Sequence, residues 1–553
     1  SVYYIQHEMQ FGWLLRGLHH FTAQAMVVLL ALHLMQVIID GAYKAPREVN
    51  FWLGLILLKI TLGLSLTGYL LPWDQKGYWA TQVATKIAGI VPVVGPSIQR
   101  LVVGGPNYGH HTLTRFFAMH AGVLPGLLIA FLVLHISVFR RHGITAPDPI
   151  HKPDATFWPD QVLKDAVACL GVLAVVLTLI LWHGAGPQGG AELGAPADPS
   201  QSYSAARPEW YFLFLFQFLK YFPGETEIYG AIVIPGALFL VLALMPFIGR
   251  WKLGHTFNVG YIAALFLGIA FLTSQAIYED RHGEKAVEYQ RAVADAEQKA
   301  HRVVELIHGP FGIGVSGARS LLHNDPKTAG PEVFARNCSQ CHSFDGHDGT
   351  GKPVAEPTAS DLGGFGTREW IRGFIVEPAG PRHFGPTARG AFNGQPNGNR
   401  FVEGQMAKWA KENVPNMKER EVAAVVEFLV SQSHRSDISP PDPELVKQGR
   451  EFFELGSDAV ETTCLGCHEM KIDGAPLGTS GLAAAPELTG YASEEWLRDF
   501  LLNPGSEQNY GKRNCMPSYK DRMSEKDLDL LLRWMRHRWY EPDQAAAEAA
   551  TSE

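Results

Sequence analysis

The sequence of 553 residues has little charge, since Asp, Glu, Lys and Arg make up only 18% of it. It also lacks a basic stripe or a platform of interleaved basic and aromatic residues, and its formal net charge is −8. These absences give no support to nucleic-acid binding, and we expect no nucleic-acid partner. Cysteine is scarce as well, and four of the six cysteines belong to two CxxCH motifs, which disfavours a disulfide framework.

No signal peptide is visible, because the chain starts at Ser1 and soon enters an apolar segment. We expect an N-terminal portion to be missing or encoded elsewhere. Long apolar runs dominate up to about residue 276, whereas the rest is charged and contains many Gly and Pro residues. The shift predicts an all-α protein in four parts. These are a membrane domain at 1–276, a polar helical leader and linker at 277–326, and two small helical domains at 327–436 and 437–545.

Six apolar segments are close to the length of about 20 residues that a bilayer requires. They lie at about 20–40, 51–72, 114–139, 165–183, 228–249 and 257–276. Positive residues follow the first, third and fifth segments, so these three connections are predicted to be cytoplasmic. The opposite side then receives the loops 73–113 and 184–227 and everything after the sixth segment. Covalent haem attachment to CxxCH takes place outside the cytoplasm in bacteria, which agrees with this orientation.

Two apolar stretches, Gly12 to Ile39 and Thr114 to Phe139, carry histidines at matched spacing. His19 and His33 are fourteen residues apart, and His120 and His135 are fifteen apart. At about 100° and about 1.5 Å per residue, fourteen helical positions return to nearly the same face about 21 Å further along the axis. A lone histidine in an apolar helix is usually a hydrogen-bonded core residue, but four at matched depths indicate function. We predict that His19 with His120, and His33 with His135, each bind one haem iron, giving two stacked haems.

Further residues of this half are placed to serve the haems. Gly54 and Gly68 are also fourteen residues apart, so each lies at the depth of one haem, where the lack of a side chain admits a flat macrocycle. Ordinary helix packing is the alternative for both. Arg16 and Arg115 are predicted to meet haem propionates at the external surface, with anchoring at the interface as the alternative. Lys59 lies between the two glycines without an evident partner.

Residues 207–211 read RPEWY, just before a short apolar segment. A carboxylate such as Glu209 beside aromatic and apolar surface is expected to have a raised pKa and could accept a proton from a bound hydroxylated ring. Pro208, Trp210 and Tyr211 complete this candidate catalytic site. Taken alone, Pro-Glu-Trp-Tyr would be read as an ordinary loop. Its presence in the same chain as the paired histidines favours the catalytic interpretation.

The soluble half contains two haem-attachment motifs. They consist of Cys338, Cys341 and His342, and of Cys464, Cys467 and His468. In a CxxCH motif the two thiols bond to the haem and the histidine binds its iron. The histidine directly after each CxxC disfavours a zinc or redox site, so we predict two covalent c-type haems.

The segments around the two motifs form an internal repeat. Trp370 and Trp496 each lie 32 residues after the first cysteine of their motif, and the ends MKEREVAAVVEF and MSEKDLDLLLRW align without a gap. Met406 lies eleven residues before Met417 and Met516 lies seven before Met523, so an insertion of four residues in the first segment restores the match. We predict these two methionines as the sixth ligands of the c haems. Ligation by His and Met tends to raise the potential of a haem. A Gly- and Pro-rich insertion at about 378–400 is expected to cover or extend the docking face of the first domain.

Several ordered motifs resemble the cytochrome b subunit of the bc1 and b6f quinol reductases. They are GWLLRGLHH, KAPRE, LTGYLLPWDQKGYWA, VPVVGPSIQ, TLTRFFAMHAGVLP and RPEWYFLFLFQFLKYFP. The resemblance covers about residues 1–276. The fifteen-residue histidine spacing is closer to the b6 branch, and the joining of both halves in one polypeptide is closer to the bc1 branch. The two CxxCH segments resemble class I cytochromes c.

This resemblance implies roles for the residues above. The pair His19 and His120 resembles the ligands of the outer, low-potential b haem, and the pair of His33 and His135 resembles those of the inner, high-potential b haem. His20 is a rival to His19, although the GWLLRxLH frame favours His19. Glu209 resembles the proton acceptor of an outer quinol-oxidation site.

The family begins with a further membrane helix that is not found here. We expect another subunit to supply it if the chain is complete. The same helix carries the cysteine for an extra haem in the b6 branch, so that haem stays undecided. Cys169 is expected to be an inert core residue and Cys515 to be incidental. Asp40, Arg140 and Arg141 are the candidates for an inner quinone site.

The resemblance implies the membrane subunit of a respiratory quinol:cytochrome c oxidoreductase, as part of a homodimeric complex in a bacterial cytoplasmic membrane. Such a complex takes quinol from the quinone pool, bifurcates its electrons and translocates protons. Because the chain contains no Rieske signature, a separate Rieske iron–sulfur protein is expected, together with a soluble or membrane-bound electron acceptor. The alternative is a dihaem b anchor or an electron conduit without bifurcation.

Overall fold

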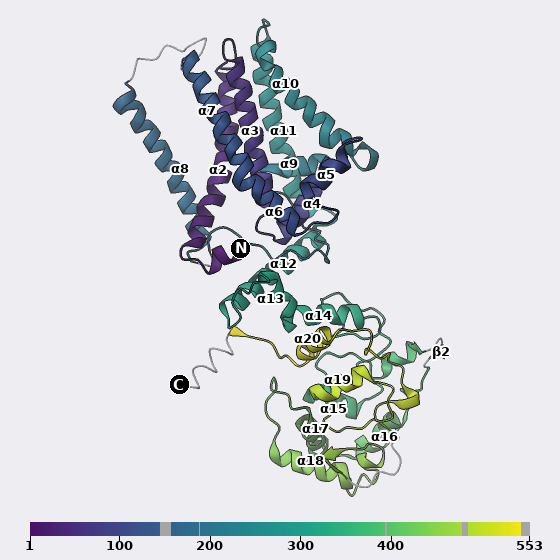
Figure 1. Ribbon diagram of the computed structural model, residues 1–553. Helices are drawn as coiled ribbons and strands as arrows, with labels where there is room; N and C mark the ends of the chain where they lie inside the picture. Colours follow the sequence, from purple (N-terminus) through teal and green to yellow (C-terminus); the bar gives the residue numbers. More distant parts are fainter. Residues whose placement is uncertain (144–155, 187–188, 393–394, 397, 478–484, 543–553) are drawn as a thin grey trace. The chain divides into compact units, whose positions relative to one another are not determined.

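The computed structural model describes residues 1–143, 156–186, 189–392, 395–396, 398–477 and 485–542. The chain divides into two compact units, Ser1–Leu321 and Leu322–Glu553. Both units are helical, and the strands of the described residues form only two short antiparallel pairs (Figure 1). This confirms the predicted all-α class, with a membrane bundle followed by helical domains.

The first unit contains the long apolar helices and several short ones. Its elements are α1 (Val2–His7), α2 (Gly12–Ile39), α3 (Glu48–Tyr69), α4 (Gln75–Gly89), α5 (Gly95–Val103), α6 (His110–Ala118), η1 (Met119–Val123), α7 (Leu124–His142), η2 (Phe157–Gln161), α8 (Val162–Trp182), η3 (Trp210–Phe212), α9 (Leu213–Leu219), η4 (Gly224–Thr226), η5 (Tyr229–Val233), α10 (Ile234–Ile248), α11 (Gly254–His282), α12 (Ala286–His308) and α13 (Ala318–Asn324), the last of which crosses the boundary between the units.

Within the described residues, six helices are long and apolar enough to cross a membrane. They span Gly12–Ile39, Glu48–Tyr69, His110–His142, Phe157–Trp182, Gly224–Ile248 and Gly254–His282. Each contains most of one predicted segment, but the ends differ, most clearly at Gly12 and at His282. Polar residues at a membrane surface can still continue the helical hydrogen bonding, so hydropathy alone underestimates the length of these helices.

The helix α3 packs along the continuous helix formed by α6, η1 and α7, and α2 packs against α8 (Figure 1). Close approach of α2 and α8 depends on Gly17, where an added Cβ would lie 3.1 Å from a side-chain carbon of Ile180. Lys59 of α3 places its ammonium 3.8 Å from the centre of the Phe239 ring, which gives this charge a cation–π partner. Helix α2 also contacts α3, so α3 lies against both α2 and α7, the three helices that matter for the site.

The second unit repeats one order of elements twice. Its elements are α14 (Pro326–Asn337), α15 (Arg368–Val376), η6 (Gly385–Arg389), β1 (Ala391–Phe392), β2 (Gln395–Pro396), α16 (Gln405–Asn413), η7 (Val414–Asn416), α17 (Glu419–Ser433), α18 (Pro443–Leu455), η8 (Cys464–Gly466), β3 (Lys471–Ile472), β4 (Ala475–Pro476), α19 (Glu494–Leu502), η9 (Gly511–Arg513) and α20 (Glu525–Met535). In repeat order, α14 corresponds to α18, α15 to α19 and α17 to α20.

The first helix of each repeat packs against the last helix of the other repeat. Helix α14 lies along α20, and α18 lies along α17 (Figure 1). Both crossings require a glycine. A Cβ added to Gly330 would lie 2.2 Å from the Cβ of Trp534, and one added to Gly449 would lie 1.9 Å from the backbone oxygen of Ala424. The two repeats therefore exchange helices within one unit.

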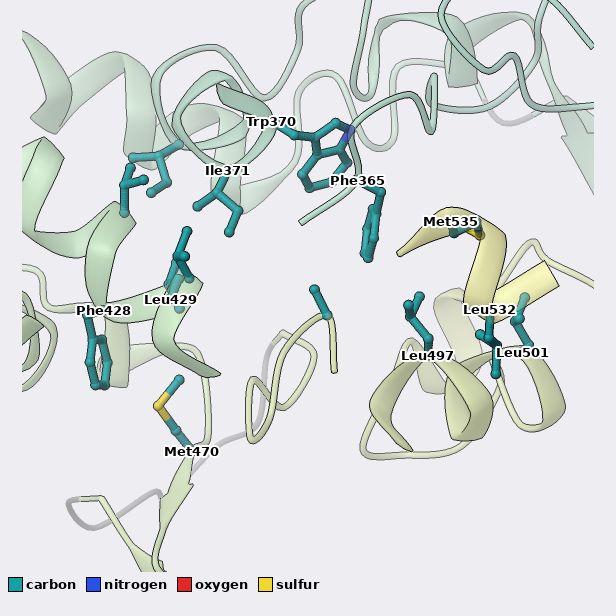
Figure 2. Close-up of a cluster of buried hydrophobic side chains, with 14 of the residues drawn as sticks. Phe365, Trp370, Ile371, Phe428, Leu429, Met470, Leu497, Leu501, Leu532 and Met535 are labelled. Carbon is teal, nitrogen blue, oxygen red and sulfur yellow. The ribbon is translucent and has the colours of Figure 1, made fainter. Parts of the chain in front are cut away.

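One hydrophobic core runs through both repeats. Figure 2 shows Leu497 of α19 beside Leu532 and Met535 of α20, all of them buried. Phe365 and Trp370, also labelled there, hold their ring centres 4.7 Å apart. Burying this many apolar side chains in common stabilises the two repeats as one body.

Candidate functional site

Two histidines from neighbouring membrane helices face each other in the first unit. The ring centres of His19 on α2 and His120 in η1 are 6.0 Å apart, with the ring planes at 89°. A metal-bound imidazole nitrogen lies about 2 Å from its metal, so this separation leaves room for one metal ion between the rings. His120 lies in the π-helical turn Met119–Val123, and such turns are frequent at functional sites.

In both His120 and His135, the ring nitrogen Nδ1 is hydrogen-bonded to the backbone of α3. His120 donates from Nδ1 to the carbonyl of Leu64 at 3.0 Å, and His135 donates from Nδ1 to that of Asn50 at 3.0 Å. Metal-binding histidines are usually oriented in this way, with Nε2 left for the metal. His33 and His135 are close enough to interact electrostatically. The four predicted histidines therefore fit the role of axial haem ligands.

The glycines of α3 lie directly against these imidazoles. A Cβ on Gly68 would lie 2.6 Å from Cε1 of His120, and one on Gly54 would lie 3.4 Å from Cε1 of His135. The first distance is too short for any carbon contact, so Gly68 leaves the space in which the His120 ring lies. The role predicted for both glycines toward a haem stays a prediction.

Replacing Gly68 by Ala is expected to displace His120 and weaken binding of a b-type haem. Overpacking of this kind costs about 1–3 kcal/mol, which corresponds to about 5- to 150-fold weaker binding. The measurement is the ratio of b-type to c-type haem in the purified protein. Gly63→Ala is the matched control, because its Cβ would lie 3.7 Å from Leu124, an ordinary contact. An equal loss in both variants would contradict the expectation.

His20, the rival of His19, has another partner. One of its ring nitrogens lies 2.7 Å from Nε2 of Gln24, and its ring packs edge-on against Phe21. The amide oxygen of the same Gln24 accepts a hydrogen bond from Nε1 of Trp210 at 3.2 Å. His20 is thus engaged on the side of the PEWY segment, which supports His19 as the partner of His120.

The two arginines predicted near haem propionates bind backbone carbonyls in the structure. Arg16 donates to Oε1 of Gln6 at 2.6 Å and to the carbonyl oxygens of Ala191 and Glu192. Arg115 donates to the carbonyl of Leu101. These contacts fasten the loop after α8 and the α5 helix, and the propionate role stays a prediction for both.

The PEWY segment, residues 208–211, is held in place by a contact with α11 and by a contact with the end of α3. Arg207 donates to both carboxylate oxygens of Asp280, with the shortest contact at 2.6 Å. The hydroxyl of Tyr69 donates to the carbonyl of Arg207 at 2.9 Å. Glu209 follows as the N-cap of the short helix that begins at Trp210, and its backbone carbonyl accepts a hydrogen bond from the N–H of Phe212 at 2.8 Å.

Burial raises the pKa of Glu209, which is half-buried. The ammonium of Lys76 acts against this shift, while the carboxylates of Glu192 and Asp74 add to it. Burial also raises the pKa of Tyr211, to about 12, and Glu209 contributes to that shift. A carboxylate with a raised pKa next to aromatic surface is suited to accept a proton near neutral pH.

The charged neighbours of Glu209 come from two distant stretches of the chain that are joined to each other. Lys76 forms an ion pair with Glu192 at 2.5 Å, and buried Asp74 accepts hydrogen bonds from the backbone of Gly77 and Gly194. Tyr3 of α1 donates to the carbonyl of Gly194. The segment before PEWY is therefore tied to the rest of the unit on both sides.

In the second unit, both CxxCH histidines are oriented alike. His342 donates from Nδ1 to the carbonyl of Ser360 at 2.7 Å, and His468 donates to that of Pro486 at 2.8 Å. Burial lowers the pKa of both imidazoles, so both are neutral and can offer Nε2 to a metal. This arrangement fits a haem iron at each motif.

One continuous cavity of about 560 Å³ reaches both motifs and both predicted methionines. Among its lining residues are Cys338, Cys341, His342, Met406, His468 and Met516. Met516 is held by Asn514, which accepts from its backbone N–H at 3.0 Å and donates to its carbonyl at 2.7 Å. Met417 and Met523, which precede the last helices, pack against the core as Met516 does, but they do not line this cavity.

Sequence reasoning missed several residues that position the site. Gln24 and Asp280 belong to no motif, and Tyr69 lies in a quoted motif that says nothing of its contact with Arg207. The PEWY-side partner of each is far away in the sequence. Asp40, Arg140 and Arg141, considered for an inner quinone site, are exposed. Part of the insertion at 378–400 lies outside the described residues, and its role in docking stays a prediction.

Three family models match the chain. The model for the N-terminal part of cytochrome b and b6 (petB) matches residues 24–188, the one for the C-terminal part of cytochrome b and b6 (petD) matches 196–291, and the cytochrome c model matches 328–433. They follow one another in the order of the membrane helices and the first haem-attachment motif.

Curated relatives match the first part of the chain. A menaquinol:cytochrome c reductase cytochrome b subunit of Geobacillus thermodenitrificans is 45% identical over 148 residues, which is 27% of this chain and 66% of that protein. Cytochrome b6 of Acaryochloris marina is 44% identical over 147 residues, or 27% of this chain and 68% of that protein. The chain thus covers just under two thirds of the first relative and slightly more than two thirds of the second.

Among solved structures, a hyperthermophilic respiratory Complex III matches with 26% identity and a TM-score of 0.40. That match covers 50% of this chain and 82% of the other.

Proposed function

Because the chain belongs to the cytochrome b family and carries a cytochrome c region after its membrane part, we propose that it is the membrane subunit of a quinol:cytochrome c oxidoreductase. In this proposal a quinol is oxidised beside Glu209. One of its electrons passes to an iron–sulfur partner, and the other crosses the membrane. Protons are released outside and taken up inside, which generates a proton-motive force.

One contact carries this proposal. The indole of Trp210 donates to Gln24, four residues after His20 on α2, so the PEWY segment lies against the helix that carries His19. Gln24 thereby ties the segment that carries the proton acceptor to His20, the residue next to His19 on the same helix. An oxidation that must remove protons and electrons from one molecule requires this proximity.

The residues described above fit four haems. His19 with His120 and His33 with His135 would hold two b-type haems, while His342 and His468 would each hold a covalent c-type haem. When bound, these groups supply one-electron transfer. The chain itself binds and orients them and holds the proton acceptor, Glu209, near the outer pair.

Glu209 would accept a proton from a quinol hydroxyl in its carboxylate form. Lys76 favours that form, whereas burial and the nearby carboxylates oppose it, and together these effects hold the pKa above the ordinary value. The partners Pro208, Trp210 and Tyr211 would shape the apolar wall on which the ring of the quinol lies. This division of roles is the one expected for a general base in a partly dry site.

Further partners follow from the proposal. A Rieske iron–sulfur protein would take the first electron, a soluble or membrane-bound acceptor would receive it after the c haems, and another subunit would supply the family's first helix if the chain is complete. We place the complex, as a homodimer, in a bacterial cytoplasmic membrane, with the c-type region on the periplasmic side. The arginines and lysines after the first, third and fifth apolar segments support this orientation.

The proposal is tested on the complex purified from its membrane. We expect an iron–sulfur protein to co-purify and quinol to reduce the c-type haems. With the inner site blocked, adding oxidant together with quinol is expected to reduce the b-type haems, which is the signature of bifurcation. Intact haems without oxidant-induced b reduction would contradict bifurcation and favour a dihaem anchor.

A further inference from the structure

The segments after the two predicted methionine ligands contact the haem-attachment motifs of the opposite repeats. Tyr519, three residues after Met516, donates from its hydroxyl to the carbonyl of Asn337, the residue before Cys338, at 2.7 Å. Tyr519 also interacts electrostatically with the thiols at Cys338 and Cys341. The methionine loop of the second repeat thus lies at the motif of the first.

The reverse contact has the same form. Trp409, three residues after Met406, donates from Nε1 to the carbonyl of Thr462 at 2.9 Å. Thr462 lies two residues before Cys464. Two aromatic side chains at equivalent places therefore fasten each methionine segment to the other repeat's motif.

The helix crossings agree with these contacts. The ring of Phe334 on α14 lies 5.6 Å from that of Trp534 on α20, and the ring of Phe453 on α18 lies 5.4 Å from that of Phe428 on α17. Phe344, two residues after His342, lies 4.3 Å from the ring of Trp534 as well. Each motif is therefore covered by the last helix of the other repeat.

From these contacts we infer that the c-type haems have crossed ligands. The haem at Cys338 and Cys341 takes His342 and Met516, and the haem at Cys464 and Cys467 takes His468 and Met406. The sequence order of each repeat suggests the opposite pairs, and the shared cavity admits either. The hydrogen bonds of Tyr519 and Trp409 decide between them.

With crossed ligation, each c-type site takes its histidine from one repeat and its methionine from the other. Neither repeat alone would hold a haem with His and Met ligands, although each has a complete set of candidate residues in its own sequence. This inference rests on covalent haem attachment at the two motifs and not on quinol chemistry. Its failure would leave the proposed oxidoreductase unaffected.

The test uses the full chain with one c-type haem removed. In Cys338→Ser/Cys341→Ser only the haem at Cys464 remains, and its oxidised form should show the methionine-to-iron charge-transfer band. Adding Met406→Ala is expected to abolish this band, while adding Met516→Ala should leave it in place. The reverse pattern would overturn the inference, as would loss of the band in both variants or in neither.

The reciprocal variant serves as a check if the first does not accumulate. In Cys464→Ser/Cys467→Ser the band should depend on Met516 and not on Met406. The helix exchange can also be measured without haem spectra. Treatment of the intact chain with a carbodiimide should link Lys327 to Glu541, whose charged atoms are 2.7 Å apart. Linkage of Lys327 to carboxylates of its own repeat alone would count against the crossed arrangement.

Discussion

Replacing Glu209 by Gln is expected to slow quinol oxidation by about a hundredfold while every haem is retained. Gln keeps the shape and polarity of the side chain but cannot accept a proton, and a positioned acid–base group contributes about 10²- to 10⁴-fold to a rate. The measurement is quinol-dependent reduction of a cytochrome c acceptor, with haem content determined on the same sample. Glu225→Gln is the matched control, because Glu225 is an exposed carboxylate that, like Glu209, lies between α8 and α10.

The pH dependence provides a second signature of the same variant. Burial raises the pKa of Glu209, so its base form is lost as the pH falls through a value above that of an ordinary carboxyl. The rate of the unmodified protein should therefore rise with pH across that value, and the rise should be absent from Glu209→Gln. A rate that is unchanged in the variant, or equally reduced in Glu225→Gln, would remove Glu209 from this role.

Replacing His19 by Ala is expected to remove one of the two b-type haems, whereas His20→Ala should retain both. Only His19 has its ring 6.0 Å from that of His120, while His20 bonds to Gln24. Loss of one axial ligand should reduce the b-type absorbance of the dithionite-reduced protein by about half, with the c-type bands unchanged.

The adjacent positions make this pair of variants a matched comparison. Both substitutions remove an imidazole from the same turn of α2, so a general disturbance of the helix would affect them equally. Loss of haem from His20→Ala alone would reverse the assignment. Because Gln24 also binds Trp210, His20→Ala is expected to disturb the PEWY side of the unit instead.

Features that repeat along the chain could be predicted from the sequence. Apolar length predicted the six helices, including the continuous helix that carries both His120 and His135. The packing of that helix against α3 came only from the structure. The CxxCH motifs are local, so their histidines could be identified without any knowledge of the fold. The ends of the helices were less predictable, because polar residues beyond residue 276 continue the last membrane helix to His282, past its apolar segment.

Contacts between distant segments could not be predicted in this way. Glu209 has Lys76 and Glu192 as charged neighbours only because two distant stretches of the chain meet. No sequence pattern in either stretch predicts this contact. The exchange of helices between the repeats could not be predicted from the sequence for a different reason. Since α14 and α18 carry the same Gly and Phe pattern, each could pair with either α17 or α20, and only the folded chain shows which pairing occurs.

The exchange of helices also has a consequence for biosynthesis. Helix α14 ends at Asn337 and its partner α20 begins at Glu525, so about 190 residues must be translated between them. At about 5–20 residues per second this takes about 10–40 s, during which the apolar face of α14 has no partner. The emerging polypeptide would need a chaperone during that interval, and the enzymes that attach the first porphyrin would meet an open chain.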